Sequence, residues 1–288
     1  MSDPIWVDET VNEPQGFRTS LLAPDGLTPV PSVQGLAVFQ NPTFGRVMIL
    51  DGGYQITERD EFIYHEMMSH VPMFAHGAPR SMLIIGGGDG GVAREALRHP
   101  SLERLVMVEI DRAVVDIALA QFPAVAGGAF DDPRLDLIID DGAHFVASAR
   151  EQFDIISVDA PDPVGAGAAL FTDEFYAAAA QRLAPGGVMV TQSGMPFLTP
   201  GWLTDHAAKL RQNFADVGFY LSTVPSYTGG PMAHSFCSNG PAARQTPLGE
   251  LETRAAALSL KTRYWTPELH RAAFALPAYI SEIITPQR

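Results

Sequence analysis

The feature of this sequence that most constrains its fold is a run of glycines between two regular segments. Residues 82–85 form a short apolar run typical of a buried strand, and Gly86, Gly88 and Gly91 follow it in the spacing G-x-G-x-x-G. A helix-forming stretch comes directly afterwards. Strand, glycine turn and helix in this order predict a site for a dinucleotide or another nucleoside. The alternative is a tight connection that binds no ligand.

The alternation of strand and helix continues after the glycine turn. Further strands are predicted at 105–108, 135–139, 154–158 and 187–191. Helices are predicted near 92–98, 112–122 and 173–183. Strands that alternate with helices form a parallel sheet with right-handed crossovers, so we expect an α/β fold.

The first sixty residues have a different pattern. Short apolar runs at 35–39 and 46–50 are separated by turn signals, which is typical of β structure. A helix is expected to begin after Thr57, a candidate N-cap followed by acidic residues, and to run towards Gly77. We therefore expect an N-terminal β-strand domain over 1–60 and a catalytic α/β domain over 61–288.

Asp89 lies inside the glycine turn and distinguishes between the ligands that such a turn binds. A pyrophosphate needs N–H donors and positive potential, which a carboxylate opposes, whereas a nucleoside with a cationic tail would be attracted. Glu109 ends the second strand, where an acid usually binds ribose hydroxyls. The nearby Asp111 fits the alternative role, a cap of the next helix, better.

Acidic residues also follow the third and fourth strands. Asp140 and Asp141 stand where such folds contact an adenine ring, although two acids before a glycine can equally form an Asx-type turn. Asp159 and Asp162 end the fourth strand beside two prolines, with a rigid turn as the alternative. Ligands bind outside the carboxyl ends of such strands, so these side chains share one crevice. The small residues at 165–170 suit a mobile lid.

Charge and composition limit the classes of function. Lys and Arg total 19 against 33 Asp and Glu, a formal net charge of −14 that disfavours nucleic-acid binding. The acidic excess could also serve solubility alone. A hydrophobic content of 46% excludes general disorder. With no apolar run long enough for a membrane span and no signal-peptide pattern, we expect a cytoplasmic protein without a membrane partner.

The sequence gives no pattern of metal ligands. The single cysteine, Cys237, excludes a disulfide framework and an all-cysteine metal cage. His65, Glu66 and His70 are similar to the zinc motif H-E-x-x-H, but the two histidines are one residue too far apart. On a helix they would point about 140° apart. We therefore expect no metal. A nucleoside site lined with carboxylates instead favours a cationic donor, such as a sulfonium, and an amine acceptor.

Several segments resemble the spermidine synthases, or polyamine aminopropyltransferases. They are residues 44–52, 57–66, 84–91, 108–111, 159–163 and 264–277. The similarity covers nearly the whole chain after residue 30. It implies a small N-terminal β domain on a methyltransferase-like Rossmann domain, assembled as a homodimer or homotetramer.

The resemblance also implies the reaction. An aminopropyl group would pass from decarboxylated S-adenosylmethionine, a co-substrate, to putrescine, giving spermidine and methylthioadenosine without a cofactor. Asp159 would be the base and Asp89 would hold the ammonium of the donor. The residues that would hold the nucleoside are Gln34, Glu109, Asp141 and Gly142. The residues that would line the amine channel are Tyr64, His65, Asp162 and Tyr227.

Departures from the family pattern leave some questions open. Ala160 and Pro161 stand where the family usually has Ser, Thr or Cys, and Ala166 replaces a usual proline. The acceptor could therefore be putrescine, cadaverine, agmatine or spermidine. Two other classes remain: an ordinary S-adenosylmethionine methyltransferase, whose donor carries a carboxylate that Asp89 would repel, and a non-catalytic polyamine-binding protein, which needs no base at Asp159.

Overall fold

The N-terminal part of the chain consists of antiparallel β structure, as predicted. The computed structural model describes residues 5–161, 163, 165–240 and 243–285. A two-stranded sheet pairs β1 (Ile5–Glu9) with β2 (Thr19–Ala23), and a four-stranded sheet has the order β3-β4-β5-β6. The strands of this second sheet are β3 (Leu27–Pro29), β4 (Ala37–Asn41), β5 (Gly45–Leu50) and β6 (Gly53–Thr57). The predicted runs at 35–39 and 46–50 correspond to β4 and β5.

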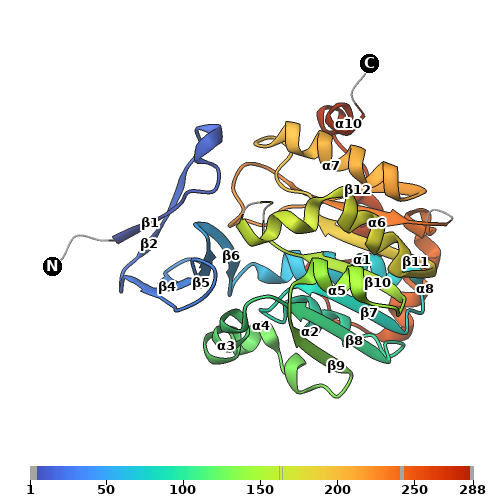
Figure 1. The fold of residues 1–288 in the computed structure, drawn as a ribbon, viewed down its shortest axis with the longest axis horizontal. Helices are drawn as coiled ribbons and strands as arrows, with labels where there is room; N and C mark the ends of the chain where they lie inside the picture. Colours follow the sequence, from blue (N-terminus) through green and yellow to red (C-terminus); the bar gives the residue numbers. More distant parts are fainter. Residues whose placement is uncertain (1–4, 162, 164, 241–242, 286–288) are drawn as a thin grey trace.

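A seven-stranded sheet forms the centre of the larger part (Figure 1). Its order is β12-β13-β11-β10-β7-β8-β9. The strands are β7 (Ser81–Gly86), β8 (Arg104–Glu109), β9 (Leu135–Ile139), β10 (Phe153–Asp159), β11 (Leu183–Gln192), β12 (Asp216–Ser222) and β13 (Met232–Ser238). Strands β7 to β11 are parallel, which confirms the predicted parallel sheet. The sequence did not indicate the antiparallel edge, where β13 pairs with both β11 and β12.

The direction of winding of this sheet reverses between β7 and β10. From β7 the chain adds β8 and β9 on one side, and it then crosses back to place β10 on the other side. Open α/β sheets bind ligands at such a switch point, outside the carboxyl ends of the strands. The fold thus places the glycine turn after β7 beside the end of β10.

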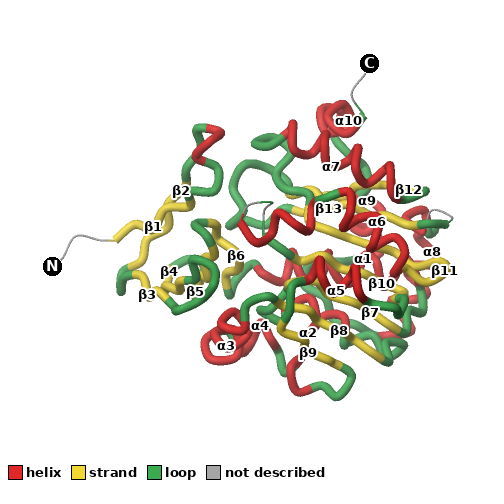
Figure 2. The backbone as a smooth tube through the Cα atoms, viewed as in Figure 1, coloured by secondary structure: helices red, strands yellow, loops and turns green. Residues whose placement is uncertain are grey.

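Helices cover both faces of the sheet (Figure 2). Side chains of β7 alternate between the faces: Met82 and Ile84 belong to one buried cluster, and Leu83 and Ile85 to the other. The first cluster includes residues of α1 (Glu61–His76), α2 (Gly91–Ala96), α8 (Leu248–Leu258) and α9 (Pro267–Ala273). The second includes residues of α5 (Gly142–Ser148), α6 (Asp173–Arg182), α7 (Pro200–Asn213) and α10 (Ala278–Ile284).

The four-stranded N-terminal sheet packs against α3 (Arg112–Gln121) and α4 (Pro123–Ala126). Met48 and Ile56 of the sheet share a buried cluster with Val114 and Phe122. Short 3-10 helices complete the fold: η1 (Glu13–Gln15), η2 (Ala129–Asp131), η3 (Gly165–Phe171) and η4 (Ala243–Gln245). The contact joins the two parts of the chain on one side of the crevice.

Helix α1 is almost entirely buried and carries several site residues. Its N-cap position is Asp60, without a side-chain capping bond, so the expected Thr57 cap was wrong. Thr57 ends β6 and donates its hydroxyl to Asp60 Oδ1 at 2.6 Å instead. Farther along, Glu66 is 2% exposed and accepts three backbone N–H groups from residues 263–265, each at 2.8 Å. The carboxylate of Glu66 therefore joins α1 to the C-terminal region.

Candidate active site

A large cavity lies where the N-terminal part meets the carboxyl ends of the parallel strands. It encloses about 1510 Å³ of empty space, including its open mouth. The predicted residues that line it are Gln34, Tyr64, His65, Gly86, Gly88, Asp89, Glu109, Asp141, Gly142, Asp159 and Tyr227. Gly91 lies behind the surface, against His65. Asp162 lies outside the described residues.

The glycine turn lets two side chains and one backbone carbonyl group approach it closely. A Cβ on Gly86 would lie 2.1 Å from the carbonyl oxygen of Asp159, and one on Gly88 would lie 2.7 Å from Glu109 Oε2. A Cβ on Gly91 would lie 2.1 Å from His65 Nδ1. Any larger residue would displace these groups, so the spacing of the glycines has a direct structural reason.

Glu109 lies buried at the end of β8. Its carboxylate oxygens accept the backbone N–H groups of Gly88 at 3.0 Å and Asp111 at 2.9 Å. Burial, opposed by these two bonds, raises the pKa of Glu109 to about 7. Asp111 caps α3 by accepting from the N–H of Ala113, as its alternative interpretation predicted.

Asp141 combines the two interpretations that the sequence left open. Its Oδ1 accepts the N–H groups of Ala143 at 2.8 Å and His144 at 3.0 Å, which caps α5. The same residue lines the cavity together with Gly142, whose added Cβ would lie 2.4 Å from Ile85. The Asx-type turn is therefore present, and it holds Asp141 at the cavity wall.

Asp159 is a partly buried residue at the end of β10 that lines the cavity. Its Oδ1 accepts the hydroxyl of Tyr64 at 2.8 Å, whereas the buried Oδ2 has no donor within the described part of the chain. Burial and the nearby charge of Asp89 raise the pKa of Asp159 to about 7, against the opposing influence of His65 and Tyr64. Near neutral pH this carboxyl group can therefore take up and release a proton.

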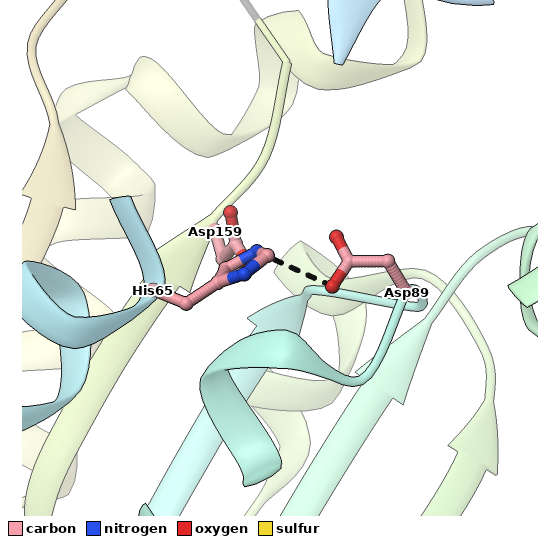
Figure 3. Close-up of side chains that lie close together, drawn as sticks. All are labelled: His65, Asp89 and Asp159. Carbon is pink, nitrogen blue, oxygen red and sulfur yellow. Dashed lines mark ion pairs between the residues drawn. The ribbon is translucent and has the colours of Figure 1, made fainter. Parts of the chain in front are cut away.

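His65 lies between the carboxylates of Glu61 and Asp89, and Figure 3 shows its ring directed at Asp89. Its Nδ1 is 2.5 Å from Glu61 Oε2, and its Nε2 is 3.3 Å from Asp89 Oδ1. Burial disfavours the charged ring, but the two carboxylates outweigh it and raise the pKa of His65 to about 10. The pKa of Asp89 is lowered because His65 outweighs the cost of burial. The pair is thus an imidazolium and a carboxylate at neutral pH.

Atoms of His65, Asp89 and Asp159 come within 4.8 Å of one another, close enough to hold a metal ion. A metal ion there would have to displace the proton that Glu61 and Asp89 hold on the ring of His65. His70 is separately engaged, with its ring nitrogens 3.1 Å from Glu95 and 3.0 Å from His99. The expected absence of a metal stays a prediction.

Some lining residues were not identified from the sequence. Gln192, at the end of β11, accepts the N–H of Gly194 at 2.8 Å and donates to the carbonyl of Pro161 at 3.3 Å. Its position at the carboxyl end of a predicted strand could have identified Gln192 as a residue that lines the cavity. Gln55 of β6 accepts the hydroxyl of Tyr227 through its carbonyl oxygen, a contact with no signal in the sequence. Tyr227 in turn packs edge-on against Tyr64, with ring centroids 6.2 Å apart.

No helix in the described ranges is long and apolar enough to cross a membrane.

Two family models match the chain. Residues 61–246 match the spermine/spermidine synthase domain, and residues 5–58 match the spermidine synthase tetramerisation domain. A polyamine aminopropyltransferase of Ruegeria sp. (strain TM1040) is 48% identical over 285 residues, covering 98% of this chain and 99% of the relative. One from Yersinia pestis (strain Pestoides F) is 47% identical over 252 residues, covering 88% and 85%.

Solved structures are similar over the same length. A spermidine synthase crystallised with the transition state analogue AdoDATO has a TM-score of 0.90 at 33% identity, covering 98% of this chain and 96% of that one. The spermidine synthase of Thermotoga maritima has a TM-score of 0.87 at 32% identity, covering 98% and 95%. The predicted Rossmann-like fold with its small N-terminal β part is confirmed.

Proposed function

The chain belongs to the spermine/spermidine synthase family and is a polyamine aminopropyltransferase, and on this premise we propose how its residues divide the work. Asp159 is the general base. The observation that carries this role is the position of Asp159 in the cavity wall, with Tyr64 donating to Oδ1 and the buried Oδ2 accepting no hydrogen bond in the described part of the chain.

The donor is decarboxylated S-adenosylmethionine. Glu109 at the end of β8 binds the ribose hydroxyls, and Asp141 with Gly142 borders the adenine, while Gln34 closes the nucleoside side from the N-terminal part. Asp89 binds the ammonium of the aminopropyl tail. Each of these residues lines the same cavity, which supports the assignment.

The acceptor is putrescine, and the product polyamine is spermidine. Tyr64, His65 and Tyr227 line the amine side of the cavity, and we assign Asp162 to that side too, although it lies outside the described residues. The two similar solved structures are spermidine synthases, which supports this choice of acceptor. Cadaverine, agmatine and spermidine remain the alternatives.

The reaction is a direct in-line displacement. The amine nitrogen attacks the methylene next to sulfur, a C–N bond forms, and the C–S bond breaks. Its electron pair stays on sulfur, so methylthioadenosine leaves as a neutral thioether and needs no acid catalyst. The proton of the amine passes to Asp159. Such general-base help contributes about 10²–10⁴-fold, and positioning of two mutually repelling cations supplies much of the rest.

The test uses two donors and a set of amines. Incubation with decarboxylated S-adenosylmethionine and putrescine should yield methylthioadenosine and spermidine by mass spectrometry. Incubation with S-adenosylmethionine should yield no S-adenosylhomocysteine. Steady-state rates across the four amines identify the acceptor. A higher kcat/KM for another amine than for putrescine would overturn the acceptor assignment but not the reaction class.

A variant tests the base. Asp159→Asn should lower kcat by about 10²-fold or more with little change in methylthioadenosine affinity, as expected for a group that acts in the transition state. A variant within tenfold of the parent would remove Asp159 from the mechanism.

We also propose a homodimer or homotetramer, which the match of residues 5–58 to a tetramerisation domain supports. Light scattering of the purified protein measures the mass of the assembly. A reaction without a cofactor, the absence of nucleic-acid partners and a cytoplasmic location stay predictions of the sequence.

A further inference from the structure

Glu61 is a buried carboxylate that the proposed mechanism does not use. It lies in the first turn of α1 and is 7% exposed. Its Oε2 is 2.5 Å from His65 Nδ1 and 3.0 Å from an Arg94 guanidinium nitrogen, and its Oε1 is 3.2 Å from the same side chain. A buried ion pair of this kind fixes the position of every group in it, because moving one leaves another unpaired.

The other ring nitrogen of His65 contacts Asp89, which lines the cavity. Nε2 lies 3.3 Å from Asp89 Oδ1, which also accepts the N–H of Gly91 at 2.7 Å. Figure 3 shows the ring of His65 directed at Asp89, with the side chain of Asp159 close to the ring. A line of contacts therefore runs from Glu61 through His65 to Asp89, one end inside the core and the other in the cavity.

The charges along this line balance, with one exception. Glu61 and Asp89 carry two negative charges, and His65 and Arg94 carry two positive charges. Among the described residues, Asp159 forms no ion pair, and the His65 ring within 4.8 Å of it already contacts Glu61 and Asp89. The charged or titratable groups that pack around His65 and Glu61 come from α1, the glycine turn, α2, β10 and the loop after β12: Tyr64, Glu66, Asp89, Arg94, Glu95, Asp159 and Tyr227. Of these, Glu95 is engaged by His70, Arg94 and Arg98, and Glu66 by backbone N–H groups.

We propose that Glu61 is a positioning residue that acts through His65: it holds the imidazole in its charged form with Nε2 towards Asp89, and thereby sets the charge that Asp159 experiences. This inference rests on the proposed role of Asp159 as the base. Glu61 itself contacts His65 and Arg94, and it does not contact the proposed base Asp159.

The physical consequence is a specific effect on pH dependence. Both carboxylates raise the pKa of His65, so neutralising Glu61 lets the ring lose its proton at lower pH. The positive charge of His65 lowers the pKa of Asp159, so its loss raises that pKa. The acidic limb of kcat/KM, which reports the base in the free enzyme, then moves to higher pH.

The experiment compares Glu61→Gln with the parent protein. NMR of protein labelled with ¹⁵N-histidine follows the titration of His65, whose signal is identified by its absence in His65→Gln. We expect the ring of the parent to stay charged through neutral pH, and its midpoint in Glu61→Gln to fall to about pH 7 or below, so that the ring loses its charge where Asp159 titrates. The acidic limb should rise by about 0.5 pH unit or more, while methylthioadenosine, which lacks the ammonium, binds within about twofold of the parent.

Two further variants separate this role from a merely structural one. Glu61→Asp keeps the negative charge, so the acidic limb of its kcat/KM profile should lie close to that of the parent. Glu103→Gln removes a carboxylate of a surface ion pair with Arg80 and should change neither readout.

The proposal fails if His65 of the parent is neutral at pH 7, a result that needs no variant. It also fails if Glu61→Gln binds methylthioadenosine normally and keeps the parental acidic limb. If the parent forms no methylthioadenosine from decarboxylated S-adenosylmethionine, the proposed function fails instead, and the titration of His65 still decides whether Glu61 controls its charge.

Discussion

We predict that the ionised carboxylate of Asp159 lowers the stability of the folded protein. In the unfolded chain this carboxyl group has its ordinary pKa of 3.8, and in the folded protein burial and Asp89 raise the pKa to about 7. The native state therefore binds the proton more tightly than the unfolded state. Below pH 3.8 both states are protonated and there is no effect; the cost grows as pH rises between the two pKa values and is constant above the higher one.

The magnitude follows from the difference between the two pKa values. One pKa unit corresponds to about 1.4 kcal/mol, so ionised Asp159 costs the folded state about 4 kcal/mol above neutral pH. Asp159→Asn keeps the size of the side chain and an oxygen that can accept the hydroxyl of Tyr64, but it removes the charge. The variant should thus be more stable than the parent by up to about 4 kcal/mol at about pH 8, and by about 3 kcal/mol less at about pH 5.

Chemical denaturation at both pH values, without ligand and at one protein concentration, measures this difference. Any difference in stability between the asparagine and aspartate proteins that does not depend on pH is the same at both pH values, so it cancels when the two values are subtracted. A stability difference that does not change between the two pH values would refute the reasoning, because the folded carboxyl group would then titrate like an unfolded one. Gain of stability with loss of activity would mark Asp159 as a group kept for function.

Three further substitutions and one chelator treatment test other parts of the site. Asp89→Asn should weaken the binding of decarboxylated S-adenosylmethionine and reduce the repulsion of the carboxylate of S-adenosylmethionine, so the ratio of the two affinities should narrow about tenfold in calorimetric titrations. The reason is that one charge pair at about 4 Å is worth on the order of 4 kcal/mol before screening. An unchanged ratio would mean that Asp89 faces away from the donor tail. Gly91→Ala should lower kcat and cost about 1–3 kcal/mol of stability, measured by rates and denaturation, because its Cβ would overlap His65. Tyr64→Phe removes a bond that lowers the pKa of Asp159, so the acidic limb of kcat/KM should move to higher pH. Prolonged EDTA treatment should leave turnover unchanged; restoration of lost activity by a divalent ion would contradict the metal-free mechanism.

Residues at strand ends were predictable from the sequence. A buried apolar run fixes where a parallel strand lies, and the carboxyl ends of such strands meet at one edge of the sheet. Glu109, Asp141 and Asp159 were found in this way, and all three line the cavity. Asp89 followed from the glycine spacing, because it lies inside the turn that follows the first parallel strand.

Contacts between distant segments were not predictable. Glu61 reads as an ordinary acid in the first turn of a helix, and its bond to Arg94 depends on how α1 packs against α2. Gln55 contributes a carbonyl oxygen, which no side-chain pattern reveals. The helix that carries Tyr64 and His65 is buried on all sides, so its periodicity gave little information about its partners.

The bond between Glu66 and the C-terminal region has a consequence for synthesis on the ribosome. The carboxylate is made 197 to 199 residues before the three backbone N–H groups that it accepts. At about 5–20 residues per second, the growing chain carries Glu66 for roughly 10 to 40 seconds without these partners. During that interval the helix that bears Tyr64 and His65 lacks its anchor, so the catalytic pocket matures only when translation is nearly complete.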